Sequence, residues 1–330
     1  MLEFTYLKSF TNDDAVQVSN LFKLVYGDNY VYPEVYEPAS FCRNHKMGIW
    51  KSVLAMSSDK QVIGHGLLWT HPNCPEIPEI GLFIVHPAAR NLGLAFKISQ
   101  KLIAIAKSNN IVGISSKQVC NHPFSQRLAQ SLGFFNLSFW PDYVSSPFVK
   151  GETRESILSA YLPLKTEPKK ILFLPQELVP SAKSLTNGLD TIESIESPND
   201  LHIVSQSELQ ITKSERKVLE LHLHRWGVDG GQKLEDINQD KLTFMLVNAE
   251  LPENTLACQS LLSSGFAFMG LIPDRFHSWA WVFSKNFSFD TSHGHVLDQR
   301  IKDLIELAQN RITMHTLFES VNKEPQLVKH

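Results

Sequence analysis

The sequence has 330 residues, a length that predicts about two domains and leaves ample material for sizeable cores. It is 43% hydrophobic and 20% charged, which excludes wholesale disorder and fibrous repeats. Lys and Arg number 31 against 34 Asp and Glu, so no global basic field exists to capture nucleic acid or a membrane surface, and we expect neither as a partner.

The cysteines and the start of the chain bear on the cell compartment. The 4 cysteines are widely spaced and include no CxxC pair, which predicts reduced thiols rather than a disulfide framework or a zinc module. The first residues lack the basic and apolar regions of a signal peptide, and no apolar run approaches the ~18 residues needed to cross a bilayer. We therefore expect a cytoplasmic protein.

The first half of the chain alternates strand and helix patterns. An apolar stripe at steps of three and four residues begins near Ala15 and stops at Gly27, which predicts a helix. The segment 26–38 is rich in tyrosine and is expected to be an irregular loop or short helix with packed rings. A nearly continuous apolar run at 79–85 is typical of a strand buried on both faces, and a tight turn leads from it into a helix that begins at Leu94. Other strands are expected at 2–7, 50–56, 61–69, 111–115 and 155–164, and a further helix at 123–131.

The second half predicts an α/β domain of its own. Between 163 and 170 the chain becomes polar and proline-bearing, so we divide it into domains 1–165 and 166–330. Beyond this boundary we expect strands at 171–174, 202–204, 242–247 and 279–283, and helices near 215–223 and 299–312. A Gly-Phe pair followed by a Pro-Asp pair occurs at 133–142 and again at 265–274, each time after a helical stretch. This repeat favours a tandem duplication over chance.

The most informative stretch is VHPAARNLGLAF at 85–96. Arg90, Gly93 and Ala95 form an RxxGxA pattern between an apolar strand and an amphipathic helix. Glycine lets the turn approach a ligand closely, alanine keeps the first helical turn small, and the free N–H groups at a helix N-terminus bind phosphate. In this position between a strand and a helix, the pattern predicts a pyrophosphate-binding turn. An RxxGxA string without these flanking elements would also fit an ordinary solvated turn.

With these flanks the pattern VxPxxRxxGxA resembles the GNAT superfamily of N-acetyltransferases, and the order of strands and helices over 1–165 is similar to that of this family. The resemblance implies an α/β (α+β) fold, a mixed and mostly antiparallel sheet flanked by helices, followed here by a second GNAT-like α/β domain. It also implies that acyl-CoA, most simply acetyl-CoA, lies where the fourth and fifth strands splay apart. The pantetheine arm would pair with the backbone of Leu82, Phe83, Ile84 and Val85, and the pyrophosphate would lie on Arg90, Asn91, Leu92, Gly93, Leu94 and Ala95.

Two residues are candidates for the chemistry that the resemblance implies. Glu79 matches a fourth-strand position where several GNAT enzymes place a glutamate as general base, and the alternative is a solvated strand-end residue paired with a nearby base. Many members carry a tyrosine four residues before the Gly-Phe pair as general acid for the CoA thiolate, but Ala129 stands there. His122 is the best substitute acid, with a capping or packing role as the alternative. Cys120 is expected to be an inert buried thiol.

The second half keeps the Gly-Phe element but has no RxxGxA at a strand-to-helix junction. The glycines within 226–231 follow no buried strand and are expected in a solvent loop. We therefore expect a degenerate copy that does not bind CoA and that supports the first domain or walls its acceptor cleft.

These observations predict an acyl-CoA-dependent N-acyltransferase that moves an acetyl group to a primary amine by direct attack and needs no metal. The alternative is a non-catalytic module that uses the same fold to hold acyl-CoA or a partner protein. The acceptor is a small-molecule or peptide amine that the sequence does not identify further, because this fold serves many acceptors.

Overall fold

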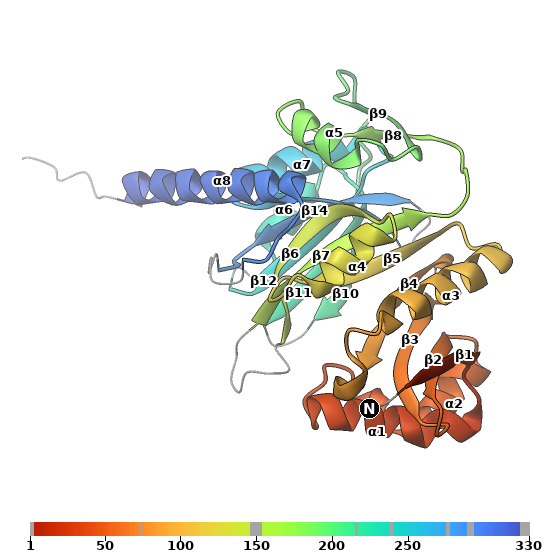
Figure 1. The fold of residues 1–330 in the computed structure, drawn as a ribbon. Helices are drawn as coiled ribbons and strands as arrows, with labels where there is room; N and C mark the ends of the chain where they lie inside the picture. The colour runs from red at the N-terminus through yellow and green to blue at the C-terminus, as the bar shows by residue number, and fades with distance from the viewer. Residues whose placement is uncertain are drawn as a thin grey trace, which may run out of the picture. The chain divides into compact units, whose positions relative to one another are not determined.

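The protein forms two compact units in a computed structural model that describes residues 3–72, 74–145, 154–214, 217–237, 240–274, 278–288 and 294–323 (Figure 1). The first unit comprises Met1–Phe135, Asp142–Pro168 and Pro273–His277, and the second comprises Asn136–Pro141, Lys169–Ile272 and Ser278–His330. The main division thus falls after Pro168, near the expected boundary at 165/166. Each unit also takes a short segment from the other half of the sequence, so fragments cut at 165/166 would leave both units incomplete.

The first unit is a mixed sheet with helices on both faces (Figure 1). Its strands lie in the order β1-β2-β3-β4-β5-β7, and β4 and β5 run parallel, whereas the other pairs are antiparallel. The predicted mixed, mostly antiparallel sheet flanked by helices is confirmed. The elements are β1 (Phe4–Ser9), α1 (Ala15–Tyr26), η2 (Pro33–Tyr36), α2 (Pro38–Lys46), β2 (Trp50–Ser57), β3 (Val62–His71), β4 (Cys74–Val85), α3 (Leu94–Ser108), β5 (Gly113–Val119), α4 (Phe124–Ser131) and β7 (Arg154–Pro163), with β6 (Phe135–Ser145) divided between the units.

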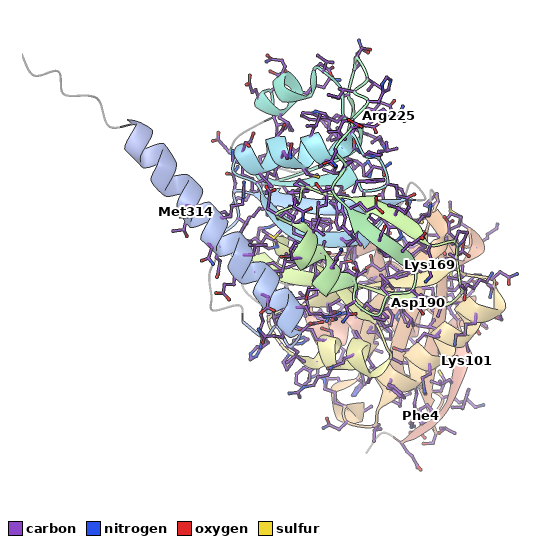
Figure 2. The ribbon with its side chains drawn as sticks, turned by 90° about the horizontal axis from the view of Figure 1, so that it is seen from above. Phe4, Lys101, Lys169, Asp190, Arg225 and Met314 are labelled. Atoms are coloured by element: carbon purple, nitrogen blue, oxygen red, sulfur yellow. The ribbon has the colours of Figure 1, made fainter. Side chains whose placement is uncertain are left out.

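Two hydrophobic cores hold this sheet, one on each face. On one face α3 contributes Leu94, Ile98, Leu102 and Ala106, which recur every four residues and are at most 2% exposed. Full burial of a Leu or Ile side chain stabilises the fold by roughly 1.5–3 kcal/mol, so this stripe anchors the helix that follows the expected phosphate turn. The opposite face of α3 is solvated and carries Lys101 (Figure 2). On the other face of the sheet, α1 and α2 close a core rich in aromatic rings.

The first-half elements differ from expectation in four places, one of which is strand β6 (Phe135–Ser145), which was not predicted. Strand β4 begins at Cys74, earlier than predicted, and its residues alternate between buried and half-buried instead of being buried on both faces. Strand β5 extends to Val119, because the polar residues after Ser115 still pair with β7. Helix α2 was not predicted, since its polar sequence has little apolar periodicity and only Ser40 and Phe41 are buried.

The second unit is also a sheet with helices. Residues Asn136–Pro141 of β6 pair with β13, and the order continues as β13-β14-β12-β11-β10, while β8 and β9 form a separate parallel pair. None of the described helices is long and apolar enough to cross a membrane. The elements are β8 (Lys170–Phe173), α5 (Val179–Thr186), β9 (Ile192–Glu196), β10 (Glu208–Ser214), β11 (Val218–Arg225), α6 (Gly230–Glu235), β12 (Leu242–Asn248), α7 (Asn254–Ser263), β13 (Ala267–Pro273), β14 (Trp279–Lys285) and α8 (Gln299–Lys323).

Three second-half predictions are wrong. The glycines within 226–231 were expected in a solvent loop with no buried strand before them, but the mostly buried strand β11 leads directly into this stretch, and Gly230 is buried and begins α6. The helix expected near 215–223 is strand β11 wherever the structure describes it, because Leu219, Leu221 and Leu223 alternate with the period of a strand. The strand expected at 202–204 is absent from the described residues there, and Val204 makes only an isolated bridge to Gly227. The helix expected at 299–312 runs on to Lys323, and Met314 projects from it with 69% of its surface exposed (Figure 2).

The Gly-Phe repeat of the sequence marks the same turn in both units. Gly133 follows α4 with φ 82°, and Gly265 follows α7 with φ 83°. Both glycines therefore adopt a left-handed conformation that other residues rarely take, and the two turns lead into β6, which contains the first Pro-Asp pair, and β13, which ends at the proline of the second.

Candidate functional site

Strands β4 and β5 are joined at one end and separate at the other. They pair only at Glu79 with Ser115 and at Ile80 with Ser116. Beyond Ile80, β4 remains paired with β3 as far as Val85, whereas β5 pairs with β7. Within the described chain, the side of β4 that faces β5 is therefore without a strand partner from Leu82 to Val85, the four residues expected to pair with a pantetheine arm.

The corresponding parallel pair of the second unit does not separate. β11 and β12 pair at every position from Val218 with Leu242 to Leu223 with Val247. Trp226, which follows β11, packs against Gly230, so a Cβ atom on that glycine would lie 2.5 Å from the indole ring. The turn is thus filled by a side chain instead of being open to a ligand.

A β-bulge at Leu82 accompanies the separation of β4 from β5. Leu82 has φ 50°, an uncommon conformation for a bulky residue that costs about 1–3 kcal/mol, and the β3–β4 register slips between Gly81 and Ile84. The extra residue in the bulge changes which face of the sheet the following side chains point to. Ile80 packs in the core beneath α3, whereas Leu82 and Ile84 pack in the core beneath α1 and α2.

The turn after β4 has the geometry of an anion cradle. Asn91 and Gly93 are both left-handed, with φ 70° and 68°, and the first backbone bond of α3 runs from the Lys97 N–H to the Gly93 carbonyl at 3.1 Å. The N–H groups of the first turn of α3 therefore have no helical acceptor. A Cβ atom added to Gly93 would meet nothing within 4 Å, so open space lies over the turn. The exposed Arg90 side chain precedes it.

A cavity of about 180 Å³ adjoins the start of the separation and is lined only by residues of the first unit. Its walls include Glu79, Gly81 and Leu82 of β4. Four aromatic side chains also line it, namely Tyr26, Tyr30, Tyr32 and Trp69. The tyrosine-rich segment that the sequence marked for packing therefore packs around a cavity, and burial raises the pKa of Tyr30 so that its phenol stays neutral.

Glu79 forms an ion pair in this cavity. Its carboxylate lies 2.9 Å from the Lys117 ammonium on β5, and the two side chains are 29% and 39% exposed. Burial is the largest single effect on Lys117 and lowers its pKa, but Glu79, Tyr143 and Tyr32 together outweigh burial and raise the pKa of Lys117. Glu155 adds a second carboxylate to the lining and is 6% exposed, so the lining holds two carboxylates and one ammonium.

His122 shares the cavity with Glu79, so both predicted catalytic residues meet there. The His122 Nδ1 is buried and has no hydrogen-bond partner among the described residues. Cys120 is fully buried and its pKa is raised to about 12 by that burial, as an inert thiol requires. Ala129 is packed in the core beneath α3, so its position cannot supply an acid. No group of three or more His, Cys, Asp or Glu side chains in the described residues could hold a metal ion.

Sequence reasoning missed Lys117, Glu155 and Trp69. Lys117 and Glu79 are 38 residues apart and come together only through the register of a parallel strand pair. The number of tyrosines between α1 and α2 was the one available signal for the aromatic wall.

Comparison with known protein families identifies the region that contains these features. Residues 17–134 match the model of the acetyltransferase (GNAT) family. The chain carries a GNAT acetyltransferase domain. This GNAT domain spans α1 to the end of the turn after α4, and it includes β4, the cradle and both candidate catalytic residues.

Solved structures similar to the chain include acetyltransferases that align with about half of its length. An N-acetyltransferase from Staphylococcus aureus is 14% identical and covers 48% of this chain and 98% of its own, with a TM-score of 0.42. A GNAT superfamily phosphinothricin acetyltransferase from Sinorhizobium meliloti, solved with AcCoA, is 17% identical and covers 50% and 93%, with a TM-score of 0.43. The ribosomal-protein-S18-alanine N-acetyltransferase from Escherichia coli is 13% identical and covers 49% and 96%, with a TM-score of 0.41. Comparison with curated proteins gave no significant match.

Proposed function

We propose that the chain is an acyl-CoA-dependent N-acyltransferase that transfers an acetyl group from acetyl-CoA to a primary amine by direct attack. The observation that carries this proposal is the continuity of one strand: β4 passes from the cavity at Glu79, along the unpaired edge at Leu82 to Val85, to the cradle at Gly93. A donor molecule and an acceptor could thus meet beside Leu82.

Acetyl-CoA fits the features of this strand and turn. Its pantetheine amides would pair with the backbone groups that Leu82, Phe83, Ile84 and Val85 present on the open side of β4, as an added strand pairs with an edge. Its pyrophosphate would lie on Arg90, Asn91, Leu92, Gly93, Leu94 and Ala95, where helix N–H groups and the open space over Gly93 suit an anion. When bound, acetyl-CoA supplies the thioester that the acceptor attacks.

The residues of the cavity supply the proton transfers. The acceptor enters as an ammonium ion, and Glu79 removes a proton from it, directly or through water, so that the nitrogen lone pair can attack the thioester carbonyl. The nitrogen then forms a C–N bond and loses its second proton to water, the C–S bond breaks, and the departing thiolate takes a proton. His122, on the same cavity, is the proposed donor of that proton.

Lys117 positions the proposed base, Glu79, in this scheme. Its ammonium holds the Glu79 carboxylate in one orientation in the resting enzyme, and an incoming ammonium must displace or share this contact. Within the described lining, the carboxylates of Glu79 and Glu155 outnumber the ammonium of Lys117, and the aromatic rings attract cations through their faces, so we expect a positively charged acceptor.

We assign residues 1–165 as the catalytic GNAT domain and 166–330 as a degenerate GNAT-like domain that does not bind CoA. The fully paired β11 and β12 and the turn filled by Trp226 support this assignment. The described lining of the cavity belongs to the first unit, and we propose that the second domain supports the first domain or walls its acceptor cleft.

Calorimetric titration with acetyl-CoA tests the proposal through a matched pair of variants. Gly93→Asn and Gly93→Asp have side chains of nearly equal size, and both residues tolerate a left-handed conformation better than most. Because only aspartate adds a negative charge to the cradle, Gly93→Asp should abolish binding, while Gly93→Asn should bind more weakly than the wild type but measurably. Equal melting temperatures of the two variants control for folding. A wild-type protein that gives no heat and no thermal shift with millimolar acetyl-CoA would overturn the proposal.

A further inference from the structure

We propose that His65 is a positioning residue for the proposed acyl transfer: it holds the Leu82–Phe83 peptide so that the Phe83 N–H is presented to the open side of β4. The inference rests on the proposed function, because that open side matters only if an acyl-CoA lies along it. His65 contacts neither the cavity nor the cradle, and it would act solely through the backbone of the bulge.

The hydrogen bonds of His65 determine its protonation. The side chain is fully buried, its Nδ1 lies 2.9 Å from the Leu82 carbonyl oxygen, and its Nε2 lies 2.9 Å from the Ser52 Oγ. A carbonyl oxygen can only accept, so Nδ1 must carry the proton and donate it to Leu82. The Nε2 lone pair then accepts the hydroxyl proton of Ser52.

The position of the ring determines the direction of the Leu82 carbonyl. The ring spans from Ser52 on β2 to Leu82 on β4, and it originates from β3, which lies between them. It therefore reaches the carbonyl from the β3 side. Since a trans peptide places its C=O and N–H on opposite sides, the Phe83 N–H points away from β3, toward the side where β5 has separated.

The surroundings of His65 are rigid enough to hold this peptide. The rings of Phe22 and Phe41 approach the imidazole edge-on, each with a centroid distance of 5.7 Å. Leu82 needs such a restraint because its positive φ is unfavourable for a bulky residue. If the carbonyl were released, the strand could return to regular geometry, which would move the backbone donors of Leu82 to Val85 out of register with a ligand.

Substitution of His65 by asparagine or glutamine tests its two hydrogen bonds separately. Asparagine places an N–H donor close to the position of Nδ1, whereas the longer glutamine places its amide close to the position of Nε2. His65→Asn can therefore still donate to the Leu82 carbonyl, and His65→Gln retains only a partner for Ser52. His45→Gln is the matched control: His45 also bonds a carbonyl through Nδ1, that of Phe41 at 2.7 Å, and lies in the same aromatic core but does not touch β4.

The experiment measures acetyl-CoA affinity by calorimetry and the melting temperature of each full-length variant. We expect all three substitutions to lower the melting temperature. His65→Gln should also weaken acetyl-CoA binding about tenfold, the effect of one hydrogen bond, whereas His65→Asn and His45→Gln should stay within about threefold of the wild type. Restoration of affinity by asparagine but not glutamine is a result that a merely structural role would not give.

The outcomes separate this inference from the proposed function. If the wild type binds acetyl-CoA and His65→Gln binds equally well, the positioning role is wrong and the proposed function stands. If the wild type does not bind, both fall. Selective ¹⁵N labelling of histidine gives a test that needs no stable His65→Gln protein, with His65→Asn serving to assign the signal. Nitrogen shifts in the wild type should show a protonated Nδ1 on His65, and a protonated Nε2 would overturn the inference because Nδ1 could not then donate to Leu82.

Discussion

Acidification should destabilise the first unit through His65 by an amount that can be calculated from its burial. Burial lowers the pKa of His65 to about 3, although the Leu82 carbonyl bond partly opposes the shift. An unfolded histidine has a pKa of about 6.5. Between these two values the unfolded chain holds one more proton at this site than the folded chain, so stability falls as pH falls from about 6.5 toward 3.

The magnitude follows from this linkage. Lowering the pH from 7 to 5 charges His65 in the unfolded chain but leaves it neutral in the folded chain, which removes about 2 kcal/mol at 1.36 kcal/mol for each pH unit below the unfolded pKa. The value does not depend on how far the folded pKa lies below 5. His45, whose pKa is also lowered by burial, adds a smaller loss of the same sign.

Urea unfolding at several pH values, read by pulsed thiol labelling, measures this loss in the first unit. Cys120 is fully buried there and is masked while the unit is folded, and Cys258, also fully buried, reports on the second unit. An aryl disulfide that reacts at acid pH labels each thiol as it becomes exposed, and peptide mass spectrometry distinguishes the two. Comparison of the two labelling curves shows whether the two units unfold in one transition. A free energy of unfolding can be calculated from the curve at Cys120 only if the transition it reports is two-state.

The His65→Asn variant isolates the contribution of the imidazole. It lacks the titrating group, whereas His45 and every carboxylate are common to both proteins and cancel in the difference. The wild type should therefore lose about 2 kcal/mol more than the variant between pH 7 and pH 5, as read at Cys120. Equal losses in the two proteins would refute the conclusion that His65 is buried and neutral.

Two further predictions concern the site itself. Glu79→Gln should reduce the rate of acetyl transfer by about 100- to 10,000-fold, with recovery at high pH and unchanged acetyl-CoA affinity, and wild-type rates at every pH would exclude Glu79 as the base. Lys117→Gln should change the pH profile of the reaction more than its maximum rate. Calorimetry of the full chain should give close to one acetyl-CoA per chain and none in Gly93→Asp, and a stoichiometry of two would contradict the assignment of the second domain.

The elements that the sequence predicted well are those specified by neighbouring residues. Helix α3 and its turn are visible because Gly93, the apolar stripe from Leu94 and the closing Asn109 lie in one continuous stretch, and each acts through local conformation. The alternation of Leu219, Leu221 and Leu223 was equally available, but this segment was predicted to be a helix. In that case the period of the pattern was the better guide.

The contacts that the sequence could not supply depend on strand register. Nothing local marks Lys117 as the partner of Glu79, because one residue of slip would turn either side chain to the other face. His65 gave no signal for the same reason, since its role arises from the bulge that brings the Leu82 carbonyl to its ring. The missing tyrosine at Ala129 was readable, and the structure adds that this position faces the core instead of the cavity.

The two parallel strand pairs explain why, among the described residues, the first unit has the features of the candidate site and the second unit does not. Both pairs begin with a strand that feeds into a turn and helix, and both are followed by a helix that ends at a left-handed glycine. In the first unit, β4 pairs with β5 at two positions and continues past the bulge at Leu82 without a described strand partner on that side; in the second, β11 pairs with β12 at all six positions from Val218 to Leu223. A regular strand is the more stable arrangement, so the strained Leu82 persists only because His65 and its aromatic neighbours hold it, and that cost is what keeps an edge of β4 available for a ligand.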